Sequence, residues 1–191
     1  MNEISRRLSP ERRARIVEAA RHLILRHGLR ATTMEAIARE AKIAKPTLYG
    51  YFPDKEAVFG AIIQALVDDI KAAVEAALDG EGDVVARVGG ALAAKYKVVA
   101  RLLKGSPHAD ELYSEHGRSA KALFATVEQE VEAAISGALQ QAGVARPRPL
   151  TQLLLASAYG IGSKAATPAE IGPAIRLLVE RLVRPELPGS E

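Results

Sequence analysis

Residues 32–55 read TTMEAIAREAKIAKPTLYGYFPDK, and this stretch decides how the chain folds. Its first half predicts a short helix, because the Thr32 side-chain oxygen can cap it and Glu35, three residues later, completes a capping box. A break from Ala41 to Ala44 leads into a second short helix, from Lys45 to about Phe52. Two short helices joined by a turn of three or four residues are typical of the helix-turn-helix.

The second of these helices has two different faces. Its apolar residues, which we expect to face inward, are Ile43, Leu48 and Phe52. Its outward residues are Lys45, Thr47 and Tyr49. In a helix-turn-helix the second helix enters the major groove of DNA, so these outward residues are candidate DNA contacts.

This part of the sequence resembles the DNA-binding domain of the tetracycline-repressor-like (TetR/AcrR) regulators. The resemblance covers roughly residues 9 to 60 and rests on Thr33, Ile37, Ala38, Ala41, Lys45-Pro46-Thr47-Leu48-Tyr49, Tyr51-Phe52 and Lys55. It implies an all-α fold with a helix-turn-helix domain of three helices in residues 1–56. A long linking helix and a helical domain for effector binding and dimerisation would fill residues 57–191. It also implies a homodimer that represses from a palindromic operator and is released by a small effector.

The positions that meet double-stranded DNA in these regulators are, by resemblance, Thr33, Lys45, Pro46, Thr47, Tyr49 and Lys55. A lysine can bind a phosphate or a guanine edge, and a threonine can reach a base through its hydroxyl or methyl group. A tyrosine hydroxyl suits a phosphate oxygen, which fixes position rather than sequence. The alternative for Tyr49, and more so for Tyr51, is an ordinary place in the core.

The segment departs from the family pattern at two positions, Lys42 and Ala44. Lys42 stands where many members have Gly, at a position expected to need left-handed backbone, at a cost on the order of 1 kcal/mol. Ala44 replaces a capping Ser, which is worth about 1 kcal/mol. Gly50 adds no side chain that could read a base, while Pro46 suits the first turn of a helix.

Composition excludes several other classes of protein. The 191 residues are 48% hydrophobic and include no cysteine, so they can form a core but no disulfide or thiolate metal site. The first residues lack the apolar run of a secretory signal, and the longest apolar stretch, Leu153 to Ile161, is too short to span a bilayer. We therefore expect a soluble cytoplasmic protein that does not enter a membrane.

Positive charge is concentrated near the N-terminus. Residues 1–60 contain twelve Lys or Arg against seven Asp or Glu, whereas residues 61–191 contain fourteen against sixteen. The alternative to a polyanion-binding face is a solvated surface of mixed charge. Together with the helix-turn-helix, the asymmetry favours DNA.

Hydrophobic spacing of about 3.6 residues predicts helices through the rest of the chain. The expected helices run from Ser9-Pro10 to His27, Asp54 to about Leu78, Asp83 to about Lys104, His108 to Glu115, Gly117 or Arg118 to Gln141, Leu150 to Ile161 and Pro168 to Val183. Thr167 should cap the last helix, and Pro173 should kink it or delay its start. No segment alternates with a period of two, which again predicts an all-α fold.

Two functional surfaces are expected in residues 57–191. The dimer interface is predicted at Leu153, Leu154, Ser157, Ile161, Ile171, Ile175, Leu178 and Leu182. A pocket for a small, mostly apolar effector is predicted at Tyr96, Val99, Leu103, Tyr113, Phe124, Val127 and Tyr159. The alternative for both sets is ordinary packing within one subunit.

Enzymatic and metal-binding readings have little support. A cluster of metal-ligand types occurs at His108, Glu111, Glu115 and His116, but its spacing matches no metal motif. We therefore expect no metal, no cofactor and no catalysis. The competing hypothesis is a helical scaffold or adaptor whose helix-turn-helix has lost DNA binding.

Overall fold

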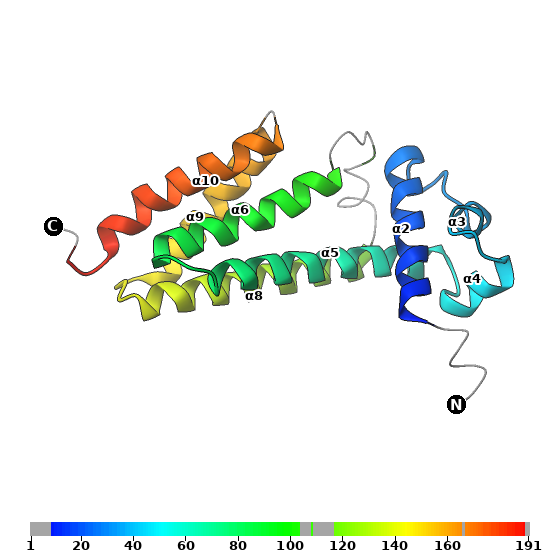
Figure 1. Cartoon of the computed structure of the whole chain (residues 1–191), viewed down its shortest axis with the longest axis horizontal. Helices are drawn as coiled ribbons and strands as arrows, with labels where there is room; N and C mark the ends of the chain where they lie inside the picture. Colours follow the sequence, from blue (N-terminus) through cyan, green and yellow to red (C-terminus); the bar gives the residue numbers. More distant parts are fainter. Residues whose placement is uncertain (1–8, 104–107, 109–116, 166, 190–191) are drawn as a thin grey trace. The chain divides into compact units, whose positions relative to one another are not determined.

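The structure is a computed structural model, and it describes residues 9–103, 108, 117–165 and 167–189. The described residues form α-helices and one short 3₁₀ turn, without any strand (Figure 1). The all-α prediction is confirmed. Contacts divide the chain into two compact units, Met1–Ala65 with Leu103–Leu123, and Leu66–Leu102 with Phe124–Glu191.

The described part of the first unit contains three helices and the beginnings of two others, α5 (Lys55–Leu78) and α8 (Gly117–Gln141). The three helices are α2 (Pro10–His27), α3 (Met34–Glu40) and α4 (Lys45–Tyr51). The Ser9 side chain caps α2 by accepting the Arg12 N–H, and Gly28 ends the helix at a φ of 82°. Asp54 caps α5 by accepting the Ala57 N–H at 2.7 Å. These caps lie where the sequence predicts them.

One apolar cluster holds α2, α3, α4 and the first part of α5 together. Its fully buried side chains are Ile16, Ile24, Ile37, Leu48, Ile62 and Ile63. Each such side chain contributes about 1.5–3 kcal/mol through burial. Because α3 and α4 have only seven residues each, they depend on this cluster rather than on their own helix propensity.

The second unit contains the remainder of α5 and four further helices. These are α6 (Val84–Leu103), α8 (Gly117–Gln141, from Phe124 onward), α9 (Pro147–Lys164) and α10 (Pro168–Val183), followed by the 3₁₀ turn η1 (Arg184–Glu186). Helices α9 and α10 pack against each other (Figure 1). Helix α6 touches both of them: the Tyr96 ring lies over Gly162 of α9, and the Arg176 side chain of α10 packs on Gly89.

The core of the second unit follows regular helical spacing. Its most deeply buried residues include Val88, Leu92, Val127, Ile135, Leu139, Leu154, Ile175 and Val179. None of the helices in the described ranges is both long and apolar enough to cross a membrane.

Two details of the second unit differ from the sequence prediction. Helix α9 begins at Pro147 rather than Leu150, because Pro147 and Pro149 both fit a first turn whose N–H groups have no helical acceptor. Helix α10 begins at Pro168 as predicted, so Pro173 does not delay it, but the Thr167 side chain makes no cap bond to the backbone. Its hydroxyl instead donates to Glu170 Oε1 at 3.0 Å. The helix predicted over His108–Glu115 lies outside the described residues, apart from His108.

Candidate nucleic-acid interface

Helix α4 presents polar side chains on the side opposite to the core. Leu48 is completely buried and Phe52 is buried, while Ile43 is half-buried at the preceding turn. On the other side, Lys45 and Pro46 are exposed, Thr47 is half-buried and Tyr49 is 44% exposed. The inward and outward faces predicted from the sequence are therefore present.

The turn before α4 has a defined hydrogen-bond pattern. Ile43 N donates to the Ala38 carbonyl at 3.0 Å, and Lys42 N donates to the Arg39 carbonyl at 3.1 Å. This pair of bonds is the Schellman motif, in which the residue after the helix cap takes left-handed backbone. Lys42 holds that position with a φ of 54°, and no other described residue except glycine has a positive φ. The expectation of left-handed backbone at Lys42 is confirmed.

The residue that caps the start of α3 differs by one position from the prediction. Thr33, not Thr32, is the cap: its hydroxyl accepts the Ala36 N–H at 3.2 Å. The Thr32 hydroxyl is buried and donates to the carbonyl of Gly28 at 2.8 Å. Glu35 therefore completes no capping box, and its carboxylate is available for another partner.

That partner is Lys45 of α4. Lys45 Nζ donates to Glu35 Oε1, and the same ammonium lies 5.9 Å from the centre of the Tyr49 ring. The bond from Lys45 holds the pKa of Glu35 below its ordinary value, and the Glu35 carboxylate raises the pKa of Lys45. Both side chains are more than half exposed, so the pair is open to solvent. Sequence reasoning missed Glu35, because the two residues are ten apart and meet only through the crossing of α3 and α4.

Helix α4 has no side-chain cap at its start. Ala44 makes no cap bond, as the sequence predicts, and Pro46 lies in the first turn. The N–H groups of Thr47 and Leu48 bond to the Ala44 carbonyl. The exposed start of α4 therefore carries Lys45, Pro46 and Thr47 close to the positive end of the helix dipole.

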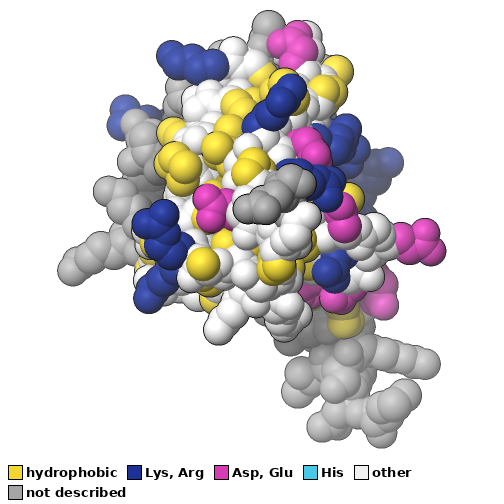
Figure 2. Space-filling model, turned by 90° about the vertical axis from the view of Figure 1, so that its left-hand side faces the viewer, with side chains coloured by type: hydrophobic (Ala, Val, Ile, Leu, Met, Phe, Trp, Pro, Cys, Tyr) yellow, Lys and Arg dark blue, Asp and Glu magenta, His cyan; other side chains and the backbone are white. Residues whose placement is uncertain are grey.

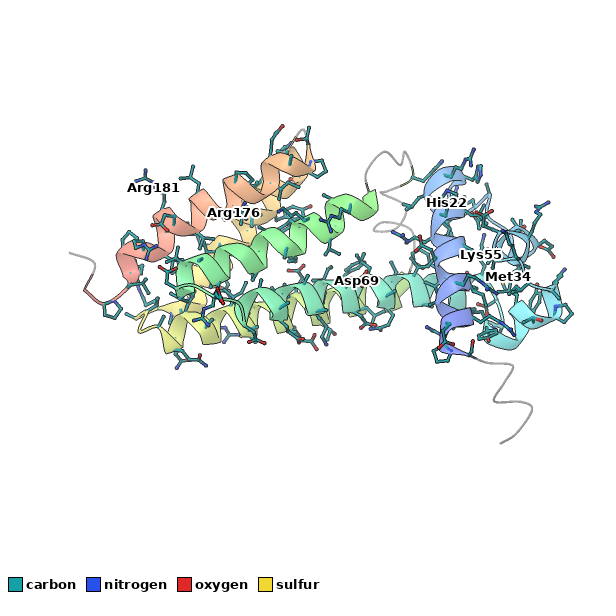
Figure 3. The ribbon with its side chains drawn as sticks, viewed as in Figure 1. His22, Met34, Lys55, Asp69, Arg176 and Arg181 are labelled. Atoms are coloured by element: carbon teal, nitrogen blue, oxygen red, sulfur yellow. The ribbon has the colours of Figure 1, made fainter. Side chains whose placement is uncertain are left out.

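Two other residues named from the sequence make contacts that hold the unit together. Lys55 Nζ donates to the backbone carbonyl of Leu29, just after α2, at 2.8 Å, and Lys55 is partly buried; Figure 3 labels it beside α2. The Tyr51 hydroxyl accepts the N–H of Ser9 at 2.8 Å. Tyr51 thus links the end of α4 to the start of α2, which agrees with the alternative of a structural tyrosine.

Some of the residues predicted for the dimer interface are buried within the chain, and others are exposed. Leu154, Ile171 and Ile175 are buried inside their own chain, so their side chains fill the core of the second unit. Leu153 is exposed, and the half-buried members of the set are Ser157, Ile161, Leu178 and Leu182. Sequence reasoning missed Leu177 of α10, which is 60% exposed.

The residues predicted for an effector pocket are not all enclosed. Tyr96 and Val127 are buried, and Val99 and Phe124 are half-buried. The Tyr96 hydroxyl donates to the carbonyl of Leu155 at 3.3 Å. Tyr159 is 67% exposed, which places it on the surface of α9, and it therefore encloses no space within one chain. Tyr113 and the side chain of Leu103 lie outside the described residues.

The cluster of His and Glu residues near residue 110, for which we expect no metal, lies mostly outside the described residues. Of its members only His108 is described, and Glu111, Glu115 and His116 lie outside the described residues. Within the described ranges, no group of three or more His, Cys, Asp or Glu side chains is placed to hold a metal ion.

These features define the class of protein. Two seven-residue helices, a left-handed turn between them and a polar outer face on the second helix make residues 34–51 a helix-turn-helix. Residues 16–62 match the family model described as bacterial regulatory proteins, tetR family. The chain therefore resembles the tetR-family regulators in its helix-turn-helix region.

Relatives with names and solved structures agree with this assignment. An uncharacterized HTH-type transcriptional regulator of Bacillus subtilis (strain 168), YhgD, is 33% identical over 72 residues, which are 38% of this chain and 38% of that protein. Matches to the curated relatives span only about a third of their length.

Solved structures match over nearly the whole fold. A TetR/AcrR-family regulator from Thermobifida fusca is 24% identical and superposes with a TM-score of 0.72, covering 88% of this chain and 96% of that one. AibR, solved in complex with isovaleryl coenzyme A and operator DNA, is 21% identical with a TM-score of 0.62, covering 90% of this chain and 98% of that one. At these identities the likeness shows the fold.

Proposed function

We propose that this chain is a sequence-specific DNA-binding transcriptional regulator, which binds a palindromic operator as a homodimer and is released by a small effector. Residues 1–56 would bind DNA, and residues 57–191 would bind the effector and form the dimer. The observation that carries the proposal is the outer face of α4, where Lys45, Thr47 and Tyr49 point away from a core anchored by Leu48 and Phe52.

The roles of the α4 side chains follow from their chemistry. The Lys45 ammonium would bind a phosphate or a guanine edge after leaving Glu35, and Thr47 would contact a base or a thymine methyl. The Tyr49 hydroxyl would hold a phosphate and so set the register of the helix. Pro46 and the Thr33-capped start of α3 would lie beside the backbone of the DNA. Lys55 would support DNA binding in two ways: its bond to the Leu29 carbonyl holds the unit together, and its positive charge attracts the phosphates.

The proposed dimer surface lies on α9 and α10. Leu153 of α9 and Leu177 of α10 are large apolar side chains that are more than half exposed, and a partner subunit would cover them. Figure 2 looks onto the end of the second unit where α10 ends and shows hydrophobic side chains between Lys and Arg side chains there. One helix-turn-helix has too little contact area for tight binding, so a two-fold pair of them is expected on the operator.

The proposed effector site lies among the helices of the second unit. Its apolar side chains would be the buried Tyr96 and Val127 and the half-buried Val99 and Phe124. AibR was solved in complex with isovaleryl coenzyme A and operator DNA, and this supports a ligand-responsive regulator on the same fold. We propose repression, in the cytoplasm and without enzymatic activity, as the mode of action.

A gel-shift assay on the DNA upstream of the chain's own gene tests the proposal. Tyr49→Ala should weaken binding to all sequences alike, whereas Thr47→Ala should cost about 1–3 kcal/mol at one position of each half-site. Lys45→Ala should weaken binding and make its salt dependence shallower by about one unit of slope. Lys71→Ala, which removes a lysine paired with Glu130 in the second unit, is the matched control and should change neither.

The competing function is a helical scaffold that has lost DNA binding. The residues Lys42, Ala44 and Gly50 motivate it, but Lys42 and Ala44 are accommodated in a complete helix-turn-helix. Failure of the purified dimer to bind any duplex at low salt would favour the scaffold.

A further inference from the structure

The second unit buries a positive charge in an otherwise apolar place. Among the described residues, the buried polar or charged side chains are Thr32, Thr151 and Lys95, and only Lys95 carries a charge. The Thr151 hydroxyl donates to the carbonyl of Pro147 within its own helix, which explains its burial. Lys95 is 2% exposed, in the middle of α6.

One carboxylate from another helix neutralises this ammonium. Lys95 Nζ donates to Glu128 Oε2 of α8 at 2.6 Å and lies 4.9 Å from the centre of the Tyr96 ring. The partners differ in their access to water: the Lys95 side chain is 3% exposed, whereas that of Glu128 is 52% exposed. Glu128 can therefore turn into solvent at little cost, but Lys95 cannot.

Stability does not account for a lysine at this position. Leu92 and Val88 precede it on α6, and Val127 and Val131 lie on α8; all four are at most 2% exposed. Removing an ammonium from water is costly, and an apolar side chain of similar size at the buried position of Lys95 would avoid that cost. A buried cation held by a displaceable carboxylate is an arrangement suited to exchanging one anion for another.

We propose that Lys95 is the recognition cation for an effector that carries one carboxylate and an apolar chain, and that Glu128 occupies this cation when the effector is absent. The effector carboxylate replaces the Glu128 carboxylate on Lys95 Nζ, and Glu128 moves into water, so the buried charge stays balanced. This inference rests on the proposed ligand-released function and narrows the effector class.

The surroundings determine the other part of the ligand. Val99 lies one helical turn after Lys95, and Phe124 lies one turn before Glu128. Both are half-buried, and Val127, one turn after Phe124 on α8, is completely buried. An alkyl chain beside these residues would gain about fourfold in affinity for each buried methylene.

Titration calorimetry with octanoate and octan-1-ol tests the site directly. The wild-type protein should bind octanoate at least tenfold more tightly than the alcohol of the same chain length. Lys95→Met, which keeps the length and apolar character of the side chain, should remove this preference. Glu128→Gln should bind octanoate several-fold more tightly than wild type, because the competing carboxylate is gone.

Lys71→Met is the matched control for this experiment. It removes a lysine that is also paired with a glutamate of α8, Glu130, but in a solvent-exposed pair. It should leave octanoate binding unchanged. Circular dichroism of each variant shows whether the helices are intact, and Glu128→Gln tests the site independently if Lys95→Met does not fold.

Three results would overturn the inference: no octanoate binding by wild type, equal binding of acid and alcohol, or a preference that survives in Lys95→Met. Gel shifts on the same samples separate this failure from failure of the proposed function. Octanoate binding through Lys95 without any DNA binding would refute the regulator, whereas DNA binding without an effect of Lys95 on octanoate would refute only the carboxylate site.

Discussion

Replacement of Lys42 by glycine should stabilise the helix-turn-helix. Lys42 has a φ of 54° at the end of α3, where its Cβ crowds the following carbonyl. For a residue with a side chain this conformation costs roughly 1–2 kcal/mol, and glycine avoids that cost. Glycine also gains about 0.4–1 kcal/mol of conformational entropy in the unfolded chain, which opposes the benefit. The net expectation for Lys42→Gly is a gain of about 0.5–1 kcal/mol in the free energy of unfolding.

Lys42 suits this measurement because little else changes with it. Its side chain is exposed, and the two bonds of the turn are made by backbone groups, so they remain in the variant. Lys42→Ala is the control: it removes the same charge and keeps the Cβ, so its stability should stay within about 0.5 kcal/mol of wild type.

Urea unfolding followed by circular dichroism supplies the free energies. In a thermal scan, a gain of this size corresponds to a rise in Tm of about 1–4 °C for a chain of this length. If Lys42→Gly were less stable than Lys42→Ala, the left-handed turn would not be strained and the argument would be refuted.

Three further predictions concern the interface, the dimer and the packing of the second unit. Glu35→Gln should tighten binding to every DNA sequence several-fold and leave the slope of its salt dependence unchanged, because Lys45 no longer has to leave a carboxylate before it reaches a phosphate; anisotropy titrations at several salt concentrations measure this, and an unchanged affinity would count against it. Leu177→Glu should lower the molar mass found by light scattering to that of one chain while circular dichroism stays unchanged; a persistent dimer would exclude Leu177 from the contact. Gly162→Ala should reduce the free energy of unfolding by about 1–3 kcal/mol, because the new Cβ would lie 2.8 Å from Tyr96 Cδ1; urea unfolding checks it, and unaltered stability would mean that the ring can move aside.

Local signals in the sequence were enough to predict most helix boundaries. Ser9 and Asp54 cap the helices that follow them, and Gly28 ends α2, because each residue type has one strong local preference at such positions. Where two neighbours were equally suited, the choice failed. Thr32 and Thr33 can both cap, and the burial of Thr32 against Gly28 decides in favour of Thr33.

Contacts between helices were beyond the reach of the sequence pattern. The Glu35–Lys45 pair depends on how α3 crosses α4, and the Lys95–Glu128 pair joins residues that are 33 apart. The stripe of apolar residues on α6 predicts the burial of Tyr96, but the neighbouring Lys95 would ordinarily be assigned to a solvated face. Similarly, the sequence pattern allows Leu154 to lie either in a dimer interface or in the core. Only the packing of α9 against α10 shows that it is buried within its own chain.

Selection of duplexes from a random library by the wild-type protein tests the central claim most directly. In a homodimer, two copies of α4 related by two-fold symmetry would each contact the DNA. The retained sequences should then contain two inverted half-sites whose centres are about 10 base pairs, or a multiple of one helical turn, apart. A retained pool as random as the starting library would contradict the account, and so would enrichment of a single half-site without its inverted copy.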